Sequence, residues 1–244
     1  GAGERVFTSS SSPGISLMQE AVSYLAGSEL PAVLVNIMRA GPGLGGILPS
    51  QADYFQATKG GGHGDYCVLV LAPWSVQEAA DLVADAFDLA DHYRNPVYIL
   101  GDGLIGQMME PVEFKEDRKP LKPLGPKTWA TTGWKGDRPR AVVNSLYLDA
   151  DTLEKHNRDL QAKYEEMRRN EVRFQGYGLD EDYDVLVVAY GTVARVCLTA
   201  VEELREQGVR AAILRPVTLF PFPYEALAQA AGKAKAVLVV ELSA

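Results

Sequence analysis

The sequence has only two cysteines among its 244 residues, and this scarcity excludes several kinds of site. Cys67 and Cys197 lie far apart, and each falls within an apolar pattern that is typical of a strand or a helix. We therefore expect two buried free thiols. Two cysteines do not supply the thiolate ligands of a usual iron–sulfur cluster. If the protein takes part in electron transfer, we expect the cluster to lie on another chain.

Long apolar runs and an excess of positive charge are missing too. No run approaches the roughly 20 residues that a membrane-spanning helix needs, and the chain does not begin with a signal-peptide pattern. The formal net charge is -8, from 24 basic and 32 acidic residues, whereas a nucleic-acid-binding protein needs a basic surface. We therefore expect a cytoplasmic protein that contacts neither a membrane nor nucleic acid.

Common nucleotide-binding and nucleophile motifs are absent or incomplete. The sequence has no G-x-x-x-x-G-K-[ST] phosphate loop and no G-x-S-x-G motif. The pattern G-x-G-x-x-G occurs twice, at residues 41–46 and 101–106, but no helical pattern follows directly in either place. A dinucleotide site needs that helix, because its N-terminus faces the pyrophosphate. An NAD-linked dehydrogenase is therefore a disfavoured alternative.

Glycine is abundant where the chain leaves an apolar strand. The run AVLVNIM, at residues 32–38, leads directly to Arg39, and eight glycines follow before residue 66. Glycine has the most backbone freedom to lose on ordering, so we expect this backbone to lie close to a ligand or another subunit. A guanidinium at the end of a strand can bind a carboxylate through two parallel hydrogen bonds. The alternative for Arg39 is a structural salt bridge.

Strands and helices alternate over the first hundred residues, which predicts a parallel α/β sheet. One helix should begin at Ser12–Pro13, a cap followed by proline, and continue to Gly27. The serine turn before it suits an anionic group or is an ordinary helix start. The expected strands are residues 5–10, 32–38, 67–72 and 95–100. A short helix is expected at residues 51–58, and a long one, capped by Ser75, that has on one side Val76, Ala79, Ala80, Val83, Phe87 and Ala90.

The sequence pattern of the second half of the chain predicts a proline-rich linker, a charged helix and a second α/β unit. The helix, at residues 149–173, is expected to be solvated or to lie between domains, with His156 and also His92 at the surface. In the last unit, Thr192 should cap a helix that carries Val196, Ala200, Leu204 and Gly208. A turn into a short helix is expected at residues 219–227, and strands at residues 184–191, 209–216 and 236–242.

A second glycine cluster, KGGGHGD, ends the region that Arg39 opens. His63, Asp65 and Cys67 alternate there and would point the same way on a strand, which is one arrangement for three metal ligands. Zinc sites more often combine residues from different elements. We therefore favour a structural or ligand-proximal role for His63 and expect no metal site on this chain.

Several stretches together resemble the α-type subunit of 2-oxoacid:ferredoxin oxidoreductases. They include TSSSSPGISLMQE (8–20), VNIMRAGPGLGGI (35–47), SQADYFQATKGGGHGDY (50–66), LAPWSVQEAADL (71–82) and YRNPVYILGDGLIGQMMEPVE (93–113). They are most similar to the branched-chain type, which acts on 2-oxoisovalerate. YGTVAR and LRPVTLFPFP resemble the domain that follows in these subunits, which is similar to the transketolase C-terminal domain.

The resemblance implies a fold, cofactors and partners. Residues 1–114 would form an α/β parallel-sheet domain of the thiamine diphosphate pyrimidine-binding type. Residues 115–182 would be a linker with a charged helix, and residues 183–244 a smaller transketolase C-terminal-like α/β domain. Thiamine diphosphate would be shared with a β-type partner subunit that binds Mg2+. Iron–sulfur clusters would lie on partner subunits. Coenzyme A would accept the acyl group, and ferredoxin would accept the electrons. A hetero-oligomer is implied.

The resemblance also implies roles for individual residues. Arg39 matches the arginine that holds the substrate carboxylate. The turn near the cofactor's pyrimidine matches Ser9, Ser10, Ser11, Ser12, Pro13 and Gly14. A loop near the active site or the partner interface matches Gly60, Gly61, Gly62, His63, Gly64 and Asp65. The family's Tyr-Pro-Ile-Thr-Pro segment and activating glutamate have no counterpart in this sequence.

Three alternatives remain at this point. One is the same chemistry on 2-oxoglutarate or pyruvate, another is a non-catalytic scaffold or interface subunit, and the third is the disfavoured dehydrogenase. The sequence starts and stops within strand-like runs. We therefore expect a fragment of a longer subunit, truncated at both ends and of poor stability in isolation.

Overall fold

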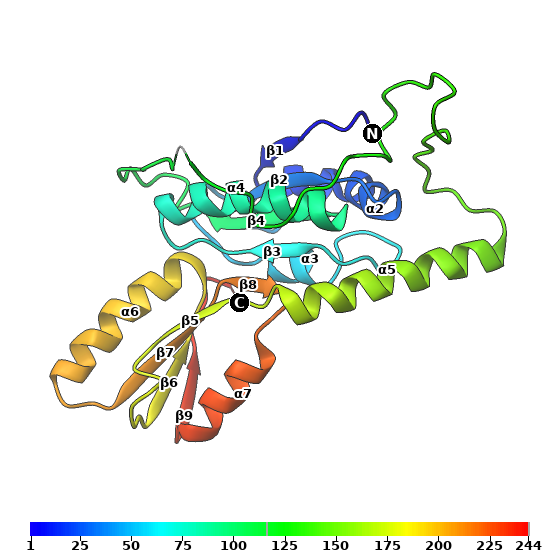
Figure 1. The fold of residues 1–244 in the computed structure, drawn as a ribbon. Coiled ribbons are helices and arrows are strands. Elements are labelled where there is room, and N and C mark those ends of the chain that lie inside the picture. Colours follow the sequence, from blue (N-terminus) through cyan, green and yellow to red (C-terminus); the bar gives the residue numbers. More distant parts are fainter. Residues whose placement is uncertain (116, 244) are drawn as a thin grey trace.

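The computed structural model describes residues 1–115 and 117–243, which form two α/β units packed against each other (Figure 1). One unit is built on a five-stranded sheet, called the first sheet, and the other on a four-stranded sheet, called the second sheet. A long extended segment and helix α5 connect the two units in sequence. The predicted fold class, two α/β units with largely parallel sheets, is confirmed.

The first sheet has the strand order β1, β2, β4, β3, β8. Neighbouring strands from β1 to β3 run parallel, whereas β8 pairs with β3 in the antiparallel sense. The sequence predicts only a turn near β8, because two prolines follow closely, so this strand was missed. The strands are β1 Phe7–Ser10, β2 Ala32–Met38, β3 Leu69–Leu71, β4 Pro96–Asp102 and β8 Thr218–Phe220.

The first predicted helix is divided in two at Met18. The N–H of Met18 donates to the carbonyl of Ile15, three residues earlier, and this tighter turn interrupts the α-helical hydrogen-bond pattern. A proline occupies the first turn, as the sequence predicts. The helices of this unit are α1 Pro13–Leu17, α2 Gln19–Gly27, α3 Tyr54–Thr58 and α4 Val76–Tyr93.

The buried face of α4 coincides only in part with the predicted one. Ser75 caps the helix as expected, and its side chain accepts a hydrogen bond from the N–H of Glu78. The residues that face the core are Leu82, Ala86, Leu89, Ala90 and Tyr93. Of the predicted set Ala90 is buried, and the half-buried Val83 and Phe87 pack against the same core. The predicted side therefore overlaps the buried face, which also includes the adjacent stripe of Leu82, Ala86 and Leu89.

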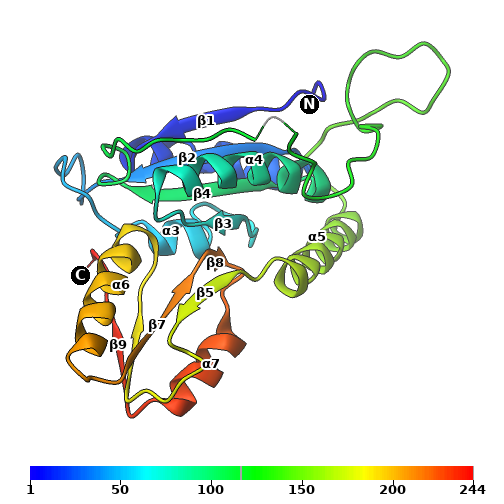
Figure 2. The same cartoon turned by 60° about the vertical axis from the view of Figure 1, so that its left-hand side comes forward.

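An extended segment and a charged helix connect the two units. Residues 103–115 and 117–149 run across α4 and form a loop near the N-terminus, as Figures 1 and 2 show. Helix α5 Ala150–Asn170 then docks on the first unit through a buried stripe of Leu160, Tyr164 and Met167. His92 is exposed, as predicted. His156 is half-buried, contrary to the prediction, because its Nε2 lies 2.8 Å from the carbonyl oxygen of Gly27 on α2.

The second sheet has the order β5, β7, β6, β9 and is parallel except for β5. The sequence does not predict β5, a short exposed strand directly after the charged helix. The strands are β5 Phe174–Tyr177, β6 Val185–Val188, β7 Ala211–Pro216 and β9 Ala236–Val239, and the helices are α6 Gly191–Glu206 and α7 Tyr224–Lys233.

Helix α6 begins earlier than predicted and buries another face. Its cap is Tyr190 rather than Thr192, which lies buried inside the first turn. The helix packs through Val193, Cys197 and Val201, while the predicted stripe of Val196, Ala200 and Leu204 is exposed. Residues 193, 197 and 201 form one i, i+4 row and residues 196, 200 and 204 the adjacent one, and the core of the second unit covers the first row. Both cysteines are free, as predicted, although Cys67 is only half-buried, and burial raises the pKa of each thiol.

Two buried polar side chains join the units. Gln51 has no solvent exposure and donates to the carbonyl of Tyr190, while its Oε1 accepts from the N–H of Leu242. Arg215 on β7 is 2% exposed and donates to the carbonyl of Ala72 and to Glu78. These hydrogen bonds fix the second sheet beside the carboxyl edge of the first.

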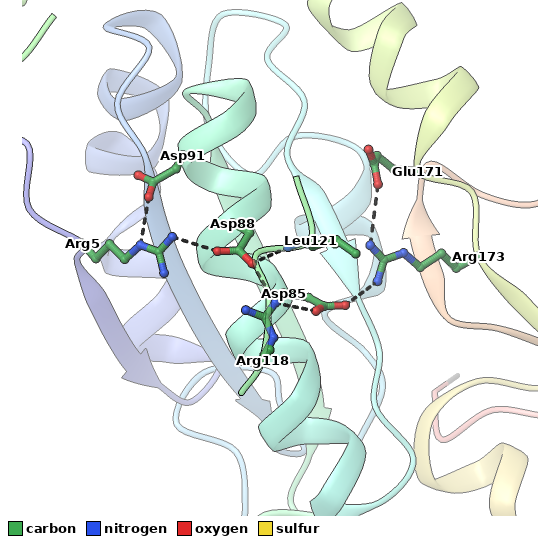
Figure 3. A network of polar contacts seen from close by, with 8 residues as sticks. All are labelled: Arg5, Asp85, Asp88, Asp91, Arg118, Leu121, Glu171 and Arg173. Atoms are coloured by element: carbon green, nitrogen blue, oxygen red, sulfur yellow. Dashed lines mark hydrogen bonds and ion pairs between the residues drawn. The ribbon is translucent and has the colours of Figure 1, made fainter. Parts of the chain in front are cut away.

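An ion-pair network covers the outer face of α4 (Figure 3). Arg5, which precedes β1, donates to Asp88 at 2.8 Å, and Arg118 of the extended segment also pairs with Asp88 at 2.8 Å. Burial alone would raise the pKa of Asp88, but the backbone N–H of Leu121 and the two guanidinium groups lower it below its usual value. The network therefore holds the extended segment and the N-terminal strand on the helix.

Within the described residues, no helix is both long enough and apolar enough to cross a membrane.

Candidate functional site

The candidate site lies where β2 ends, at the carboxyl edge of the first sheet. β2 leads directly to Arg39, which forms an isolated bridge with Pro49. The N–H of Ala40 donates to the carbonyl of Leu48 at 2.9 Å, so residues 40–48 form a closed loop that projects from the sheet (Figure 2). Ligands of open parallel α/β sheets bind outside this edge.

The loop requires glycine at position 45. Gly45 has a φ of +58°, and a Cβ there would lie 1.7 Å from the carbonyl oxygen of Ala40. A side chain would therefore collide with backbone that cannot move without opening the loop. The glycine-rich sequence after Arg39 thus allows the chain to fold closely back on itself.

The serine turn between β1 and α1 contacts the backbone of Arg39. The N–H of Arg39 donates to Oγ of Ser12 at 3.1 Å, and the N–H of Ser12 donates to Oδ1 of Asn36 at 3.1 Å. Ser12 has a φ of +21° and a ψ of -76°, a conformation that residues with side chains seldom adopt. These hydrogen bonds hold the turn against β2.

A pocket of about 740 Å³ opens beside Arg39. Ser12 and Pro13 line it on one side, together with the start of α3. Arg39 is the only cation among the described residues that line the pocket, and its Nε is buried without a hydrogen-bond partner among them. The opposite wall comes from the second unit and is mostly apolar: Tyr190, Glu241 and Ser243 also line it, but its other residues are Val188, Ala189, Pro216, Phe222, Leu227, Val239 and Val240. The pocket therefore offers a guanidinium on one side and a mostly apolar wall on the other.

Two tyrosines in the pocket remain protonated at neutral pH. Burial raises the pKa of Tyr54 and of Tyr190 above the usual value for a phenol. The hydroxyl of Tyr190 donates to the carbonyl of Gln51 at 3.3 Å. Neither phenol is suited to act as a base, so both serve as walls and hydrogen-bonding groups. The acidic residues that line the pocket are Asp53, which accepts from Asn36, and the exposed Glu241.

The predicted serine turn is only partly in the pocket. Ser12 and Pro13 line it, whereas Ser9, Ser10, Ser11 and Gly14 do not. Gly14 instead makes room for Ser10, since a Cβ at position 14 would lie 2.0 Å from Oγ of Ser10. These residues therefore shape the turn, and Ser12 and Pro13 face the pocket.

The second glycine cluster lies at the opposite edge of the first sheet. It precedes β3, whereas Arg39 follows β2, and both strands run parallel to β4 between them. Gly60, Gly62, His63, Gly64 and Asp65 line a separate pocket of about 1040 Å³ with the end of α5 and residues 219–229. Gly61 packs on Gln19, whose Oε1 would lie 2.2 Å from a Cβ at that position. The structure does not bring this loop to Arg39.

Among the described residues, no group of three histidine, cysteine, aspartate or glutamate side chains is placed to hold a metal ion. The trio of His63, Asp65 and Cys67 therefore does not converge. Likewise no helix follows residues 101–106 directly. The structural requirement for a dinucleotide fingerprint is thus not met there.

Sequence reasoning missed three polar residues that shape the site. They are Asn36, which is 1% exposed, the buried Gln51 and the half-buried Asp53. One signal was available for Asn36, because it is the only polar residue in the run AVLVNIM. Gln51 and Asp53 follow a loop, where polar residues are ordinary and give no such signal.

Two family models cover the chain. Residues 1–173 match the model described as pyruvate flavodoxin/ferredoxin oxidoreductase, thiamine diP-bdg. Residues 183–244 match pyruvate:ferredoxin oxidoreductase core domain II.

Curated relatives match nearly the full length of the chain. Ketoisovalerate oxidoreductase subunit VorB of Methanothermobacter marburgensis is 51% identical over 99% of this chain and 68% of its own length. 2-Oxoglutarate synthase subunit KorA of Archaeoglobus fulgidus is 38% identical over 100% of this chain and 69% of its own length. A solved 2-oxoglutarate:ferredoxin oxidoreductase from Magnetococcus marinus has a TM-score of 0.80 at 22% identity, over 98% of this chain and 46% of that chain, and so shows the shared fold. The chain therefore belongs to the family of 2-oxoacid:ferredoxin oxidoreductase subunits.

Proposed function

We propose that the chain is part of the α-type subunit of an enzyme that oxidatively decarboxylates branched-chain 2-oxoacids, with ferredoxin as electron acceptor and an acyl-CoA as product. The observation that carries this proposal is the single cation in a pocket with a mostly apolar wall. Arg39 would bind the 2-oxoacid carboxylate, and the apolar residues of the second unit would face an aliphatic side chain. The 51% identity to a ketoisovalerate oxidoreductase subunit supports the same substrate class.

The same pocket is less suited to 2-oxoglutarate, the 2-oxoacid in the names of other relatives. That substrate has a second carboxylate, which needs its own cation or a set of hydrogen-bond donors when it is removed from water. Arg39 is the only positive side chain among the described lining residues. A monocarboxylate with a branched apolar chain therefore matches the pocket better.

Thiamine diphosphate is the cofactor that the first family model names, and it would supply the carbanion chemistry of decarboxylation. We propose that Ser12 and Pro13 lie beside its pyrimidine, with Ser9, Ser10, Ser11 and Gly14 shaping the turn from behind. The buried Nε of Arg39 has no hydrogen-bond partner among the described residues and is available to an anionic group of the substrate. This chain's part is to orient the substrate and to exclude water.

The remaining components would come from partner subunits. We propose that a β-type subunit binds the diphosphate and Mg2+, and that iron–sulfur clusters lie on partner chains, with residues 1–114, 115–182 and 183–244 as the domains of this one. Exposed apolar side chains near the pocket support such a partner, namely Leu17, Leu44, Ile47, Leu48 and Phe55, which are 69–88% exposed. Apolar side chains gathered at one site mark interaction surfaces.

The test is a substrate comparison with the complete subunit co-expressed with its partners. CoA-dependent viologen reduction is measured with 2-oxoisovalerate, 2-oxoglutarate and pyruvate. We expect the highest kcat/KM with 2-oxoisovalerate. A preference for 2-oxoglutarate would refute the argument from the pocket's single cation, and no activity with any 2-oxoacid would favour a scaffold subunit.

Arg39 is tested in the same assay. Arg39→Ala should raise KM about 100-fold, since losing one partner of a hydrogen-bonded charge pair costs about 2.8 kcal/mol. Arg39→Lys keeps the charge but loses the two-pronged geometry, so we expect an intermediate KM. Unchanged kinetics in Arg39→Ala would remove this residue from the site.

A further inference from the structure

Asn36 occupies an unusual place for a polar side chain. It lies on β2, which is an interior strand of the first sheet and is otherwise apolar, and only 1% of it is exposed. Removing an amide from water is unfavourable unless its groups are hydrogen-bonded. Both ends of this amide are bonded, each to a different segment of the chain.

The two hydrogen bonds of Asn36 join the elements that surround Arg39. Its Oδ1 accepts from the N–H of Ser12 at 3.1 Å, in the turn before α1. Its Nδ2 donates to Oδ2 of Asp53 at 2.9 Å, at the start of α3. Three segments that are distant in the sequence are thus held at one point, three residues before Arg39.

The turn at Ser12 needs such support. Backbone in a sparsely populated region costs of the order of 1–3 kcal/mol and persists only when its surroundings hold it. Ser12 has a φ of +21° and is held by two hydrogen bonds. The N–H of Ser12 donates to Asn36, and the Oγ of Ser12 accepts from the N–H of Arg39. That Oγ also lies 3.3 Å from the carbonyl oxygen of Arg39, so the hydroxyl contacts both backbone groups of the arginine.

We propose that Asn36 is a positioning residue that aims Arg39 into the pocket by way of Ser12. This inference rests on the proposed function, in which Arg39 binds the substrate carboxylate. Asn36 fixes Ser12, and the Ser12 hydroxyl fixes the backbone from which the guanidinium extends. Asp53 orients the amide of Asn36 so that its oxygen faces Ser12. Asn36 itself does not line the pocket and does not touch the substrate.

Another buried asparagine offers a matched control. Asn95 has no solvent exposure and lies just before β4 in the same sheet, at the edge opposite Arg39. Its Nδ2 donates to the carbonyls of Cys67 and Pro96 at 3.0 and 3.1 Å. Asn95→Ala therefore removes an equally buried amide with two hydrogen bonds from the same sheet without touching the serine turn.

The experiment uses the complete subunit assembled with its partners and measures KM and kcat for 2-oxoisovalerate, together with thermal unfolding. Asn36→Ala should raise KM about tenfold, the effect of one lost hydrogen bond worth about 1.4 kcal/mol. We expect kcat to change less than twofold, because the arginine binds the carboxylate in the ground state and the transition state alike. Asn95→Ala should lower the unfolding temperature similarly and leave KM unchanged.

A double-mutant cycle separates positioning from general destabilisation. If Asn36 acts through the arginine, Asn36→Ala should have less than a twofold further effect on KM once Arg39→Ala is present. An equal effect in both backgrounds would overturn the inference. If Asn36→Ala fails to fold, Ser12→Ala interrupts the same connection from the half-buried turn and should give the same rise in KM.

The possible failures are distinguishable. If Arg39→Ala does not change KM, the proposed carboxylate site is wrong and this inference falls with it. If Arg39→Ala raises KM but neither Asn36→Ala nor Ser12→Ala does, the carboxylate site stands and only the positioning role is overturned. If Asn95→Ala raises KM as much as Asn36→Ala does, the effect is one of stability and the inference is also overturned.

Discussion

Arg215 provides the sharpest test of how the two units are held together. Its guanidinium is 2% exposed and pairs with Glu78 at 2.5 Å, donates to Gln175 at 2.8 Å, and lies 4.3 Å from the centre of the Trp74 ring. In Arg215→Met the apolar contact with the ring is partly kept, but Glu78 loses its cation. Leaving one partner of a buried ion pair alone costs about 3–5 kcal/mol.

The lower end of that range applies here. Glu78 remains 18% exposed and still accepts a hydrogen bond from the N–H of Trp74. We therefore expect a loss of about 3 kcal/mol, which corresponds to a fall of about 6–12 °C in Tm for a domain of this size. The measurement is thermal unfolding of the complete subunit, followed by circular dichroism. Glu78→Gln combined with Arg215→Met should recover more than half of the loss, because no unpaired charge remains buried.

An exposed arginine beside the same strand supplies the control. Arg210 pairs with Asp184, and their side chains are 52% and 34% exposed. Arg210→Met should cost less than about 1 kcal/mol, as surface ion pairs do. If Arg215→Met leaves Tm within 2 °C of the wild type by the same scale, or if the double variant is no better than the single one, the buried pair does not secure the second unit.

Three further predictions concern the helix, the loop and the partner surface. The folded-state pKa of Asp88 is lowered, so the stabilisation that this carboxylate gives the protein is complete above the unfolded pKa of about 3.9 and is lost as pH falls through the lower folded value. Asp88→Asn should therefore flatten the dependence of the urea midpoint on pH between about 5 and 2. An unchanged slope would contradict this. Gly45→Ala should distort the loop after β2, since a Cβ there meets the carbonyl oxygen of Ala40. We expect a higher KM for the 2-oxoacid with little change in Tm. Wild-type kinetics would show that the loop does not shape the site. Leu44→Asp should weaken assembly with the partner subunits in co-purification without lowering Tm, because this side chain is 81% exposed in the chain alone; normal assembly would place the interface elsewhere.

Much of the fold follows from local pattern. The run AVLVNIM predicts β2 with its observed bounds, and the cap Ser75 predicts the start of α4. Helix faces are less certain when apolar residues occupy two adjacent stripes, as in α6, where Val193, Cys197 and Val201 are buried instead of the neighbouring set. Periodicity reveals that a helix has an apolar side, but tertiary contacts decide which stripe is covered.

The candidate site could be predicted only in part. Arg39 stands out because a cation directly follows an apolar strand. The pocket beside it depends on residues such as Phe222 and Leu227, which come from the other unit. No local sequence feature indicates that these residues line the pocket. The two glycine clusters look like one region in the sequence, yet they lie at opposite edges of the sheet. Their separation follows from parallel strand order, which the sequence alone does not specify.

The pairing of β8 with β3 bears on how the chain folds as it is synthesised. The edge of the first sheet is completed by Thr218–Phe220, which the ribosome delivers well over a hundred residues after β3 has emerged. Until then the backbone groups of β3 along that edge are unpaired, and an unpaired edge invites association with other chains. The first sheet is therefore completed only after the part of the chain that contains β8 has been synthesised. A gene fragment that ends at residue 173, where the first family match ends, should yield a chain that depends on chaperones and aggregates when they are scarce.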